Sequence, residues 1–600
     1  MFFSCYCGRR EKATEWQKSL ADHARWLDLT VHMESCCSDD THYCGVAWLV
    51  RQTQLPVKPI MQSPAGWSCS TSTALTEPEA LAAEIELAKH LAPFSFPDNP
   101  IVSYQFKTNT LEVVVPPAAG EQFYIASDGH GVMLANDLRL MRRWKSAELN
   151  PTAIYALLQF RAIPPNLALY RGVDRIPNGH RCICRVEKGD WSFVPFFLPA
   201  QSESRQALRN IGEPEAVDKL QELLDQRLLK LPKSSFLFFS GGVDSTLLAA
   251  RLAALERRDV QLINFCFGPD DAEGKAALAV ASLLNMPCTQ IAYREQDFAE
   301  MLTRIGREYS FPFGDSSTIP MNLMVHLSLS QIGTDGSVIE GVGPDQLFSD
   351  KLIDQKWALA QSLPVWLQAL GSDVYQWLEL WENECRLGTL TNIIRKLRQM
   401  PRIFAQVMAI NSLDGIAYKI PKQNRIELYQ TIQANILDLA DGLDTVDQYC
   451  LLNLIHFAVG TVGAKSCDLY RLYNLHLHVP YLMREIVELG FSLPISVRAS
   501  DGVDKSLLKK LLLRSVPKEI VFRPKKGFDP PFMRMAAQPA MQDYLLHVAL
   551  ADQDPLLGFM RKRVLDRLYA KILQGQQLSY DAYRFTWLVL FTSIWLEQQK

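Results

Sequence analysis

Short apolar runs bounded by Pro, Gly or Asp fill the first 200 residues of the chain. Their length and their content of β-branched and aromatic residues are typical of strands. Helical spacing of apolar positions appears between them. The expected strands are 45–50, 111–115, 122–126 and 131–135, and the expected helices are 77–90 and 138–143. This pattern predicts a first domain of strands and short helices.

The pattern changes after a polar stretch at 198–204. A helix is expected from about Pro214, and apolar runs of strand length then alternate with helical spacing. This alternation predicts a doubly wound parallel sheet with helices on both faces. The expected strands are 235–239, 260–267, 289–292 and 337–340, and the chain beyond about 355 is expected to be helical. We expect two domains, 1–200 and 201–600, in a fold of α/β and α+β class.

One segment of the second domain has the features of a phosphate-binding loop. The apolar run Phe236–Phe239 enters a Ser-Gly-Gly turn, and an Ala- and Leu-rich helix follows. Glycines let the backbone approach a phosphate, and the first helical turn attracts the anion. Ser240 and Ser245 can add hydroxyl donors, whereas the Asp244 carboxylate implies a divalent cation between itself and the phosphates. The loop therefore predicts an ATP site with Mg²⁺.

An N-capped helix after a glycine turn would explain the glycines of this string, but not its serines and carboxylate together. The string also differs from a Walker A loop. The nearest match to such a loop, Gly268–Ala276, has one residue too many and an alanine where a metal-binding hydroxyl belongs.

Composition narrows the function classes. The 600 residues exceed the size at which one hydrophobic core stops growing, so at least two domains are expected. The formal net charge of −3 argues against a nucleic-acid surface. No apolar stretch reaches membrane-spanning length, and Phe585–Leu596 is expected to be a buried core helix. The N-terminus lacks the apolar region of a signal peptide. We expect a cytoplasmic protein without membrane or nucleic-acid partners.

The 13 cysteines suit a reducing compartment, where isolated thiols are small core residues. An N-terminal group raises the question of zinc. Its spacings are C-x-C, CC and H-x-C rather than the C-x₂₋₄-C pairs of structural zinc sites, so no zinc site is expected there. The group consists of Cys5, Cys7, Cys36, Cys37, His42 and Cys44.

The phosphate loop resembles that of ATP pyrophosphatases, and the order of parts resembles the asparagine synthetase family over nearly the full length. Gly341–Phe348 is similar to the family's Gly-x-Gly-x-Asp-Glu-x-Phe segment, and Arg523–Phe528 is similar to its lysine loop. Further similar segments are 135–139, 149–153, 169–173 and 176–180. The resemblance implies an Ntn-type αββα glutaminase-like domain before a HUP-like pyrophosphatase domain with a helical C-terminal part.

The resemblance also implies roles for particular residues. Asp244 and Asp345 are expected to contact the metal, and Lys525 is expected to stabilise charge on oxygen and phosphate, supported by Arg523. The expected nucleotide contacts are Phe238, Ser240, Gly241, Gly242, Val243, Asp244, Ser245, Phe267, Gly341 and Gly343.

The residue that a class II glutaminase requires is not where it is expected. Such enzymes use an N-terminal cysteine whose α-amine is the base, but position 2 is Phe2. Exposing Cys5 would require the removal of four residues. We therefore expect a scaffold without ammonia chemistry, so that an amine on another molecule, or on the activated substrate itself, supplies the nitrogen.

Family members that lack this cysteine include β-lactam synthetases and lasso-peptide cyclases. β-Lactam synthetases place a Tyr between the two glycines as part of a base pair, and asparagine synthetases place Glu there; here the residue is Val342. A peptide α-amine has a reference pKa of about 7.7–8.0 and is partly neutral near pH 7. This favours a macrolactam synthetase acting on a precursor peptide, with a leader peptidase as partner. A small-molecule amide ligase and a catalytically dead scaffold remain alternatives.

Three further polar residues are candidates for substrate contact. Asp315 and Ser316 lie in a polar cluster, where Asp315 could face substrate or cap the helix that starts near Pro320. His478 stands where the family has Arg, so substrate contacts there are expected to be remodelled. A lone His in such a setting is more often a hydrogen-bonded core residue than a catalyst.

Overall fold

The structure is a computed structural model of the chain. It describes residues 2–38, 42–50, 60–70, 78–92, 95–145, 148–165, 167–268, 270–293, 297–315, 317–333, 335–349, 438–500, 503–524, 536–549, 554–576 and 580–599.

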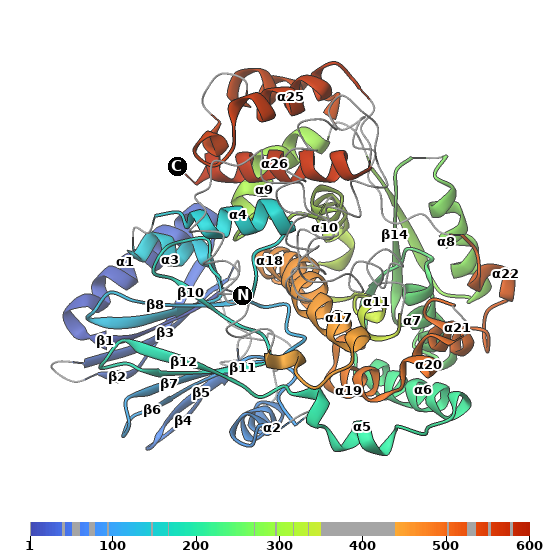
Figure 1. Cartoon of the computed structure of the whole chain (residues 1–600), viewed down its shortest axis with the longest axis horizontal. Coiled ribbons are helices and arrows are strands. Elements are labelled where there is room, and N and C mark those ends of the chain that lie inside the picture. Colours follow the sequence, from blue (N-terminus) through green and yellow to red (C-terminus); the bar gives the residue numbers. More distant parts are fainter. Residues whose placement is uncertain are drawn as a thin grey trace, which may run out of the picture.

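Two six-stranded antiparallel sheets form the first third of the protein (Figure 1). The first sheet has the order β10-β8-β9-β1-β3-β2 and the second β12-β11-β7-β6-β5-β4. The strands of the first are β1 Phe2–Arg9, β2 Thr30–Ser38, β3 His42–Val50, β8 Phe123–Ser127, β9 Gly131–Ala135 and β10 Asp174–Ile176. Those of the second are β4 Ile60–Ser63, β5 Gly66–Ser70, β6 Ile101–Gln105, β7 Thr110–Val115, β11 His180–Arg185 and β12 Asp190–Pro195.

The two-residue period of β1 explains how these sheets are packed. Phe3 and Cys5 face a core shared with the second sheet, whereas Phe2 and Tyr6 face a core shared with helices. The helices on that outer face are α1 Arg10–Leu27 and α3 Leu138–Lys145, and α2 Pro78–Lys89 contacts β5 and β6 of the second sheet. The sequence pattern did not predict β1, because a central strand buried on both faces shows no polar alternation.

A five-stranded parallel sheet forms the centre of the rest of the protein, in the order β15-β14-β13-β16-β17. Its strands are β13 Phe236–Phe238, β14 Gln261–Cys266, β15 Cys288–Ala292, β16 Ser337–Ile339 and β17 His476–His478. The predicted strands 235–239, 260–267, 289–292 and 337–340 match four of them closely. Beyond 355 the described residues are overwhelmingly helical, as expected; the exception is the three-residue strand β17, which is too short for a periodic signal.

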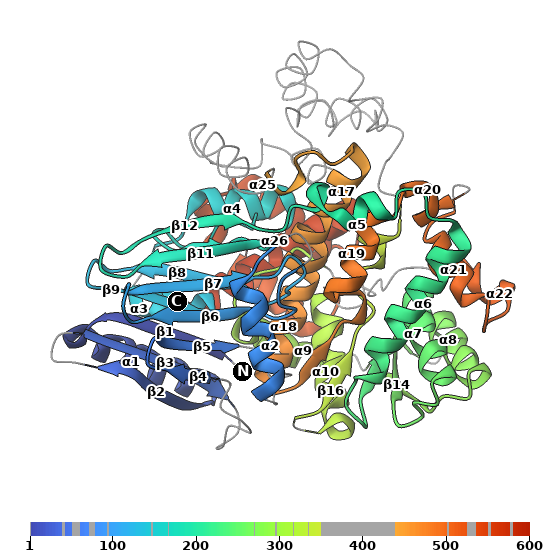
Figure 2. The ribbon, with the colours of Figure 1, turned by 90° about the horizontal axis from the view of Figure 1, so that it is seen from below.

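Helices cover both faces of this sheet, as the alternating pattern predicted. Leu237 and Ile339 pack into one apolar core with α6, α7, α8, α19 and α21, and Phe236 and Val338 pack into another with α9, α10 and α26. Figure 2 shows α6, α7 and α21 lying together. These helices are α6 Glu213–Leu229, α7 Val243–Ala254, α8 Ala272–Leu283, α9 Asp297–Glu308, α10 Thr318–Ile332, α19 Arg484–Ser492, α21 Ser506–Leu512 and α26 Tyr580–Gln598.

Shorter helices complete the described chain. They are α4 Pro151–Phe160, η1 Pro199–Gln201, α5 Glu203–Ala207, α11 Pro344–Leu347, η2 Asp438–Ala440, α17 Thr445–Asn453, η3 Leu454–Gly463, α18 Ala464–Leu472, η4 Pro480–Leu482, α20 Ile495–Arg498, α22 Lys518–Val521, α24 Pro539–Tyr544, η6 Leu545–Ala549, η7 Pro555–Gly558 and α25 Lys562–Leu573. The predicted core segment Phe585–Leu596 lies in α26 and is buried.

One described helical stretch, Val446–Leu472, is long and apolar enough to cross a bilayer by length and composition. Inside the protein, 78% of its most apolar window is buried, as in the core helix of a soluble protein. The stretch runs through α17, η3 and α18 and also touches the N-terminal sheets, because Gln122 Nε2 donates to the carbonyl of Gly460 at 3.0 Å. The predicted boundary near residue 200 stays a prediction.

Candidate nucleotide site

The parallel sheet has a switch point between β13 and β16. From β13 the chain moves outward to β14 and β15, and it then returns to add β16 on the opposite side of β13. Loops that leave the carboxyl ends of such neighbouring strands frame a ligand crevice. The Ser-Gly-Gly turn follows β13 and the segment Glu340–Gly343 follows β16. Both glycine turns singled out in the sequence therefore lie at this switch point.

The turn after β13 is tightly fitted. Gly241 has a φ of 67°, and a Cβ there would lie 2.9 Å from the Cα of Ala277 in α8, so a larger residue would clash with backbone. The Ser240 and Ser245 hydroxyls lie 3.2 Å apart and close the turn. Helix α7 starts directly after Gly242. Because glycine has no side chain, Gly242 does not cap the N–H groups of the first helical turn.

The second glycine turn lies against the first. A Cβ on Gly341 would lie 3.5 Å from both the Asp244 Cβ and the Ser245 amide nitrogen. Gly343 has a φ of 119° and packs against Leu482. Val342, between the glycines, is partly buried against apolar neighbours. The two turns are thus in contact distance of each other, as a joint phosphate and metal site requires.

A lysine joins the two predicted metal carboxylates. Lys505 Nζ lies 2.8 Å from Asp244 Oδ2 and 2.8 Å from Asp345 Oδ1. Its side chain is 9% exposed, against 25% for Asp244 and 61% for Asp345. Burial opposes the charge of Lys505, but the two carboxylates outweigh it and raise the pKa of the ammonium above its usual range. The structure therefore brings Asp244 and Asp345 to one point, where both are already compensated by a cation.

Arg523 reaches the same loop from the C-terminal part of the chain. Its Nη2 lies 3.5 Å from the Gly241 carbonyl oxygen and 3.1 Å from Glu273 Oε2. Two of the predicted site residues, Lys525 and Ser316, lie outside the described residues.

The two aromatic residues expected to contact the nucleotide lie at the ends of two neighbouring strands. Phe238 is the last residue of β13 and stacks on Tyr470, with ring centroids 6.3 Å apart. Phe267 follows β14 and packs edge to face against Phe265, with ring centroids 5.5 Å apart. Both rings are half-buried, so the structure places them along the carboxyl edge of the sheet where a base could stack.

The family model described as asparagine synthase matches residues 219–597. The chain belongs to the asparagine synthase family. The match runs from within α6 into α26, and both glycine turns and Lys505 lie inside it.

Curated relatives are distant. A putative glutamine-hydrolysing asparagine synthetase of Mycobacterium bovis is 25% identical over 391 residues, covering 63% of this chain and 57% of that protein. Asparagine synthetase 1 of Bacillus subtilis, also named as glutamine-hydrolysing, is 20% identical over 505 residues, covering 79% of this chain and 72% of that one. The chain thus spans little more than half the length of the mycobacterial relative.

Two solved structures are loosely similar. An ammonia-dependent NAD synthetase of Campylobacter jejuni is 13% identical with a TM-score of 0.19, over 38% of this chain and 96% of that one. A glutamine phosphoribosylpyrophosphate amidotransferase of Bacillus subtilis is 10% identical with a TM-score of 0.22, over 58% and 82%.

A buried carboxylate that the sequence did not single out lies beside the second glycine turn. Glu340 precedes Gly341 and accepts hydrogen bonds from Ser466 Oγ at 3.0 Å and Tyr470 Oη at 2.5 Å. Burial raises the pKa of Glu340, opposed by these hydrogen bonds and by Lys465. Because Tyr470 also stacks on Phe238, Glu340 fixes one wall of the expected base site.

Asp315 is part of a buried ion pair. Its Oδ2 lies 2.5 Å from Lys465 Nζ, and it accepts hydrogen bonds from the Ser317 amide and hydroxyl just before α10. Burial alone would raise the pKa of Asp315, but Lys465 and Ser317 lower it to about 2. The N-cap position of α10 is Ser317, without a side-chain cap, so both the capping role and the substrate contact of Asp315 stay predictions.

His478 lies on β17, where its carbonyl accepts from the Glu340 amide at 2.9 Å. Burial, with a smaller effect of the neighbouring His476, lowers the pKa of His478 to about 4, so the ring is neutral at pH 7. Its Nε2 is buried without a hydrogen-bond partner among the described residues. Whether His478 contacts substrate or is a core residue stays a prediction.

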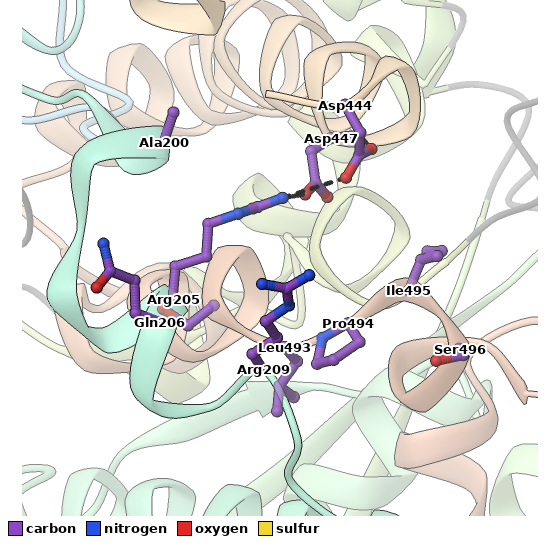
Figure 3. Close-up of a pocket in the computed structure, with 11 residues that line it drawn as sticks. Ala200, Arg205, Gln206, Arg209, Asp444, Asp447, Leu493, Pro494, Ile495 and Ser496 are labelled. Atoms are coloured by element: carbon purple, nitrogen blue, oxygen red, sulfur yellow. Dashed lines mark hydrogen bonds and ion pairs between the residues drawn. The ribbon is translucent and has the colours of Figure 1, made fainter. Parts of the chain in front are cut away.

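A separate cavity of about 530 Å³ opens between α5, the start of α17 and the turn from α19 to α20 (Figure 3). Arg205 lies in it 3.1 Å from Asp444 and 2.6 Å from Asp447. Asp444 and Asp447 thus place two carboxylates beside Arg205, and Arg209 also lines the cavity. None of its lining residues belongs to the glycine turns.

Proposed function

We propose that the protein is an ATP-dependent, AMP-forming carbon–nitrogen ligase. The observation that carries this proposal is the convergence of two glycine turns, Asp244, Asp345 and Lys505 at the switch point of a parallel sheet. A backbone turn that tolerates no Cβ, a helix N-terminus and a pair of carboxylates suit a nucleotide triphosphate with its cation. Membership of the asparagine synthase family supports the same chemistry.

The first step in this proposal is activation of a carboxylate. A carboxylate oxygen of the substrate attacks the α-phosphorus of ATP, the bond to the β-phosphate breaks, and pyrophosphate leaves with the electron pair. Mg²⁺, held by Asp244 and Asp345, would offset charge on the leaving group. Lys505 compensates these carboxylates beforehand, and its ammonium is close enough to turn toward the phosphates when they enter.

The second step is attack of an amine on the acyl-adenylate. The nitrogen bonds to the acyl carbon, the acyl–oxygen bond breaks, and AMP leaves while the amine loses a proton. Lys525 and Arg523 are our candidates for stabilising the charge that develops on oxygen, with Arg523 already at the Gly241 carbonyl.

We propose that the amine belongs to the substrate itself. Cys5 is buried and lies in the middle of β1 with strands paired on both sides. A glutaminase nucleophile must be reached by glutamine, which a thiol enclosed in that core is not. An intramolecular amine would remove the need for ammonia.

In its specific form, the proposal is a macrolactam synthetase of the lasso-peptide type, acting in the cytoplasm. It would adenylate an Asp or Glu side chain of a precursor peptide and join it to the N-terminal amine, after a leader peptidase has exposed that amine. Val342 offers no base between the glycines, which suits an α-amine that is partly neutral near pH 7.

A second candidate is an amide ligase for a small carboxylate. The names of the mycobacterial and Bacillus relatives, both asparagine synthetases, favour it. ATP–pyrophosphate exchange separates the two, because exchange would depend on a precursor peptide in the first case and on aspartate or another small acid in the second. Dependence on neither, together with no ATP binding, would instead support a scaffold without catalysis.

A further inference from the structure

Three cysteines of the first sheet meet inside the N-terminal sandwich. Cys5 and Cys7 are two residues apart on β1 and therefore share a face, and Cys44 on β3 lies directly opposite Cys7. Cys7 Sγ lies 2.7 Å from Cys44 Sγ and 3.6 Å from Cys5 Sγ. All three sulfurs lie within 4.8 Å of one another. We call these residues the thiol cluster.

The surroundings of the thiol cluster are apolar. Its members are between 0% and 3% exposed, in a core built from both sheets. Neighbours in that core include Val46, Trp48 and Val132. A single buried cysteine in such a place behaves as a small apolar residue. Three that point their sulfurs at one another instead offer a concentrated set of soft ligands.

We infer that the thiol cluster is a binding site for a thiophilic d¹⁰ metal ion held by three sulfurs. Soft thiolates select Cu⁺ and Zn²⁺ over hard cations, and the metal would balance the charge that buried thiolates cannot carry alone. Sulfurs that converge on one point from two strands require only small side-chain rotations to surround an ion at the zinc–sulfur distance of about 2.3 Å.

This inference departs from the expectation drawn from spacing. The C-x₂₋₄-C rule describes ligands on tight loops. On a strand, residues two apart lie on the same face about 6–7 Å apart along the chain, and the third ligand comes from the neighbouring strand. The spacing C-x-C with a distant cysteine is therefore adequate for a site on a sheet, although the sequence gives no sign of the strand pairing.

The test uses the full-length protein, purified anaerobically with reductant and without chelator. We expect elemental analysis to find a single Cu or Zn ion per chain. After removal of that metal, titration with Cd²⁺ is expected to give a sulfur-to-metal charge-transfer absorption that saturates at one equivalent. The Cd²⁺-loaded protein should also unfold at a higher temperature than the metal-free protein.

Cys7→Val and Cys44→Val are the deciding variants, because valine keeps an apolar side chain in this core. Both should lose the absorption and the metal-dependent rise in unfolding temperature. Cys184→Val is the matched control: Cys184 forms a C-x-C pair with Cys182 on β11 in the same core, without a third cysteine in the described metal-ligand groups. It should bind Cd²⁺ like the wild type.

Other outcomes would overturn the inference. The site does not exist if the reduced wild type gives no charge-transfer absorption, or if Cys184→Val loses it as fully as Cys7→Val. A Cys7–Cys44 disulfide in protein kept under reductant, found by peptide mapping, would show a redox pair in place of a metal site. If Cys7→Val does not fold, Cys44→Val alone decides, with circular dichroism as the check of folding. None of these readouts depends on ligase activity.

Discussion

Replacement of Lys505 by methionine tests the geometry of the nucleotide site most specifically. Methionine keeps the apolar stem but removes the ammonium that lies 2.8 Å from both Asp244 and Asp345. Loss of the charged hydrogen bonds to half-buried Asp244 should cost about 1.5–3 kcal/mol of stability. The contact with Asp345, whose side chain is 61% exposed, should add only about 0–1 kcal/mol because water screens it.

The same variant should change how the protein responds to Mg²⁺. In the wild type without ATP, Mg²⁺ must displace the ammonium, so we expect little rise in unfolding temperature. In Lys505→Met the two carboxylates are uncompensated, and Mg²⁺ at a hundredfold excess over its Kd should stabilise the fold by about 2.7 kcal/mol. ATP–pyrophosphate exchange should fall by about 10²–10³-fold, the usual cost of removing one preorganised charge.

The assays are thermal unfolding with and without Mg²⁺, and pyrophosphate exchange with saturating substrate. Lys509→Met is the matched control, because Lys509 lies one turn further along α21, with its Nζ 5.5 Å from the centre of the Phe522 ring. It should behave like the wild type in both assays. A Lys505→Met protein with wild-type exchange and an unchanged response to Mg²⁺ would refute the assignment of these carboxylates to the metal.

Four further predictions follow from the described contacts. Asp244→Ala and Asp345→Ala should each abolish substrate-dependent AMP formation with the fold intact, which product analysis and circular dichroism can check; near-normal turnover would exclude that residue from the metal site. Asp315→Asn leaves Lys465 unpaired and should lower stability by about 3 kcal/mol near pH 7. The pKa of Asp315 is lowered to about 2. Its contribution to the free energy of unfolding is therefore full above about pH 4 and is lost as the pH falls toward 2. The stabilities of the variant and the wild type should accordingly converge in acid unfolding experiments. Cys5→Ala should leave amide synthesis unchanged, and the wild type should release no glutamate from glutamine; release that the variant loses would contradict the buried position of this thiol. Ring closure should rise with pH from roughly 7 to 8.5 while adenylation changes little, and an N-acetylated peptide should support exchange without cyclic product; a cyclic product from that peptide would identify another nitrogen.

The sequence predicted the strand, glycine turn and helix around Ser240–Ser245 well, because their signals are local. A strand, a turn of two glycines and a helix are encoded by adjacent residues, and the structure forms them at β13, Gly241 and α7. The alternating pattern likewise predicted four of the five parallel strands, since each is an isolated apolar run.

The parts that the sequence did not predict depend on contacts between distant residues. Lys505 lies 261 residues from Asp244, and nothing in its neighbours marks it as different from other lysines of the C-terminal helices. Glu340 and Tyr470 are separated by 130 residues and are joined only when α18 packs beside β16. The thiol cluster required the register of β1 against β3, which a strand without polar alternation does not reveal.

We propose that this chain activates a carboxylate as an acyl-adenylate at the Ser240–Ser245 loop. The most direct measurement is ATP–pyrophosphate exchange by the wild type and by Asp244→Ala, across candidate precursor peptides and small carboxylates. We expect exchange in the wild type with a peptide that carries a free Asp or Glu side chain, and none in Asp244→Ala. Formation of ADP and phosphate in place of AMP and pyrophosphate, or equal exchange by Asp244→Ala, would contradict the account.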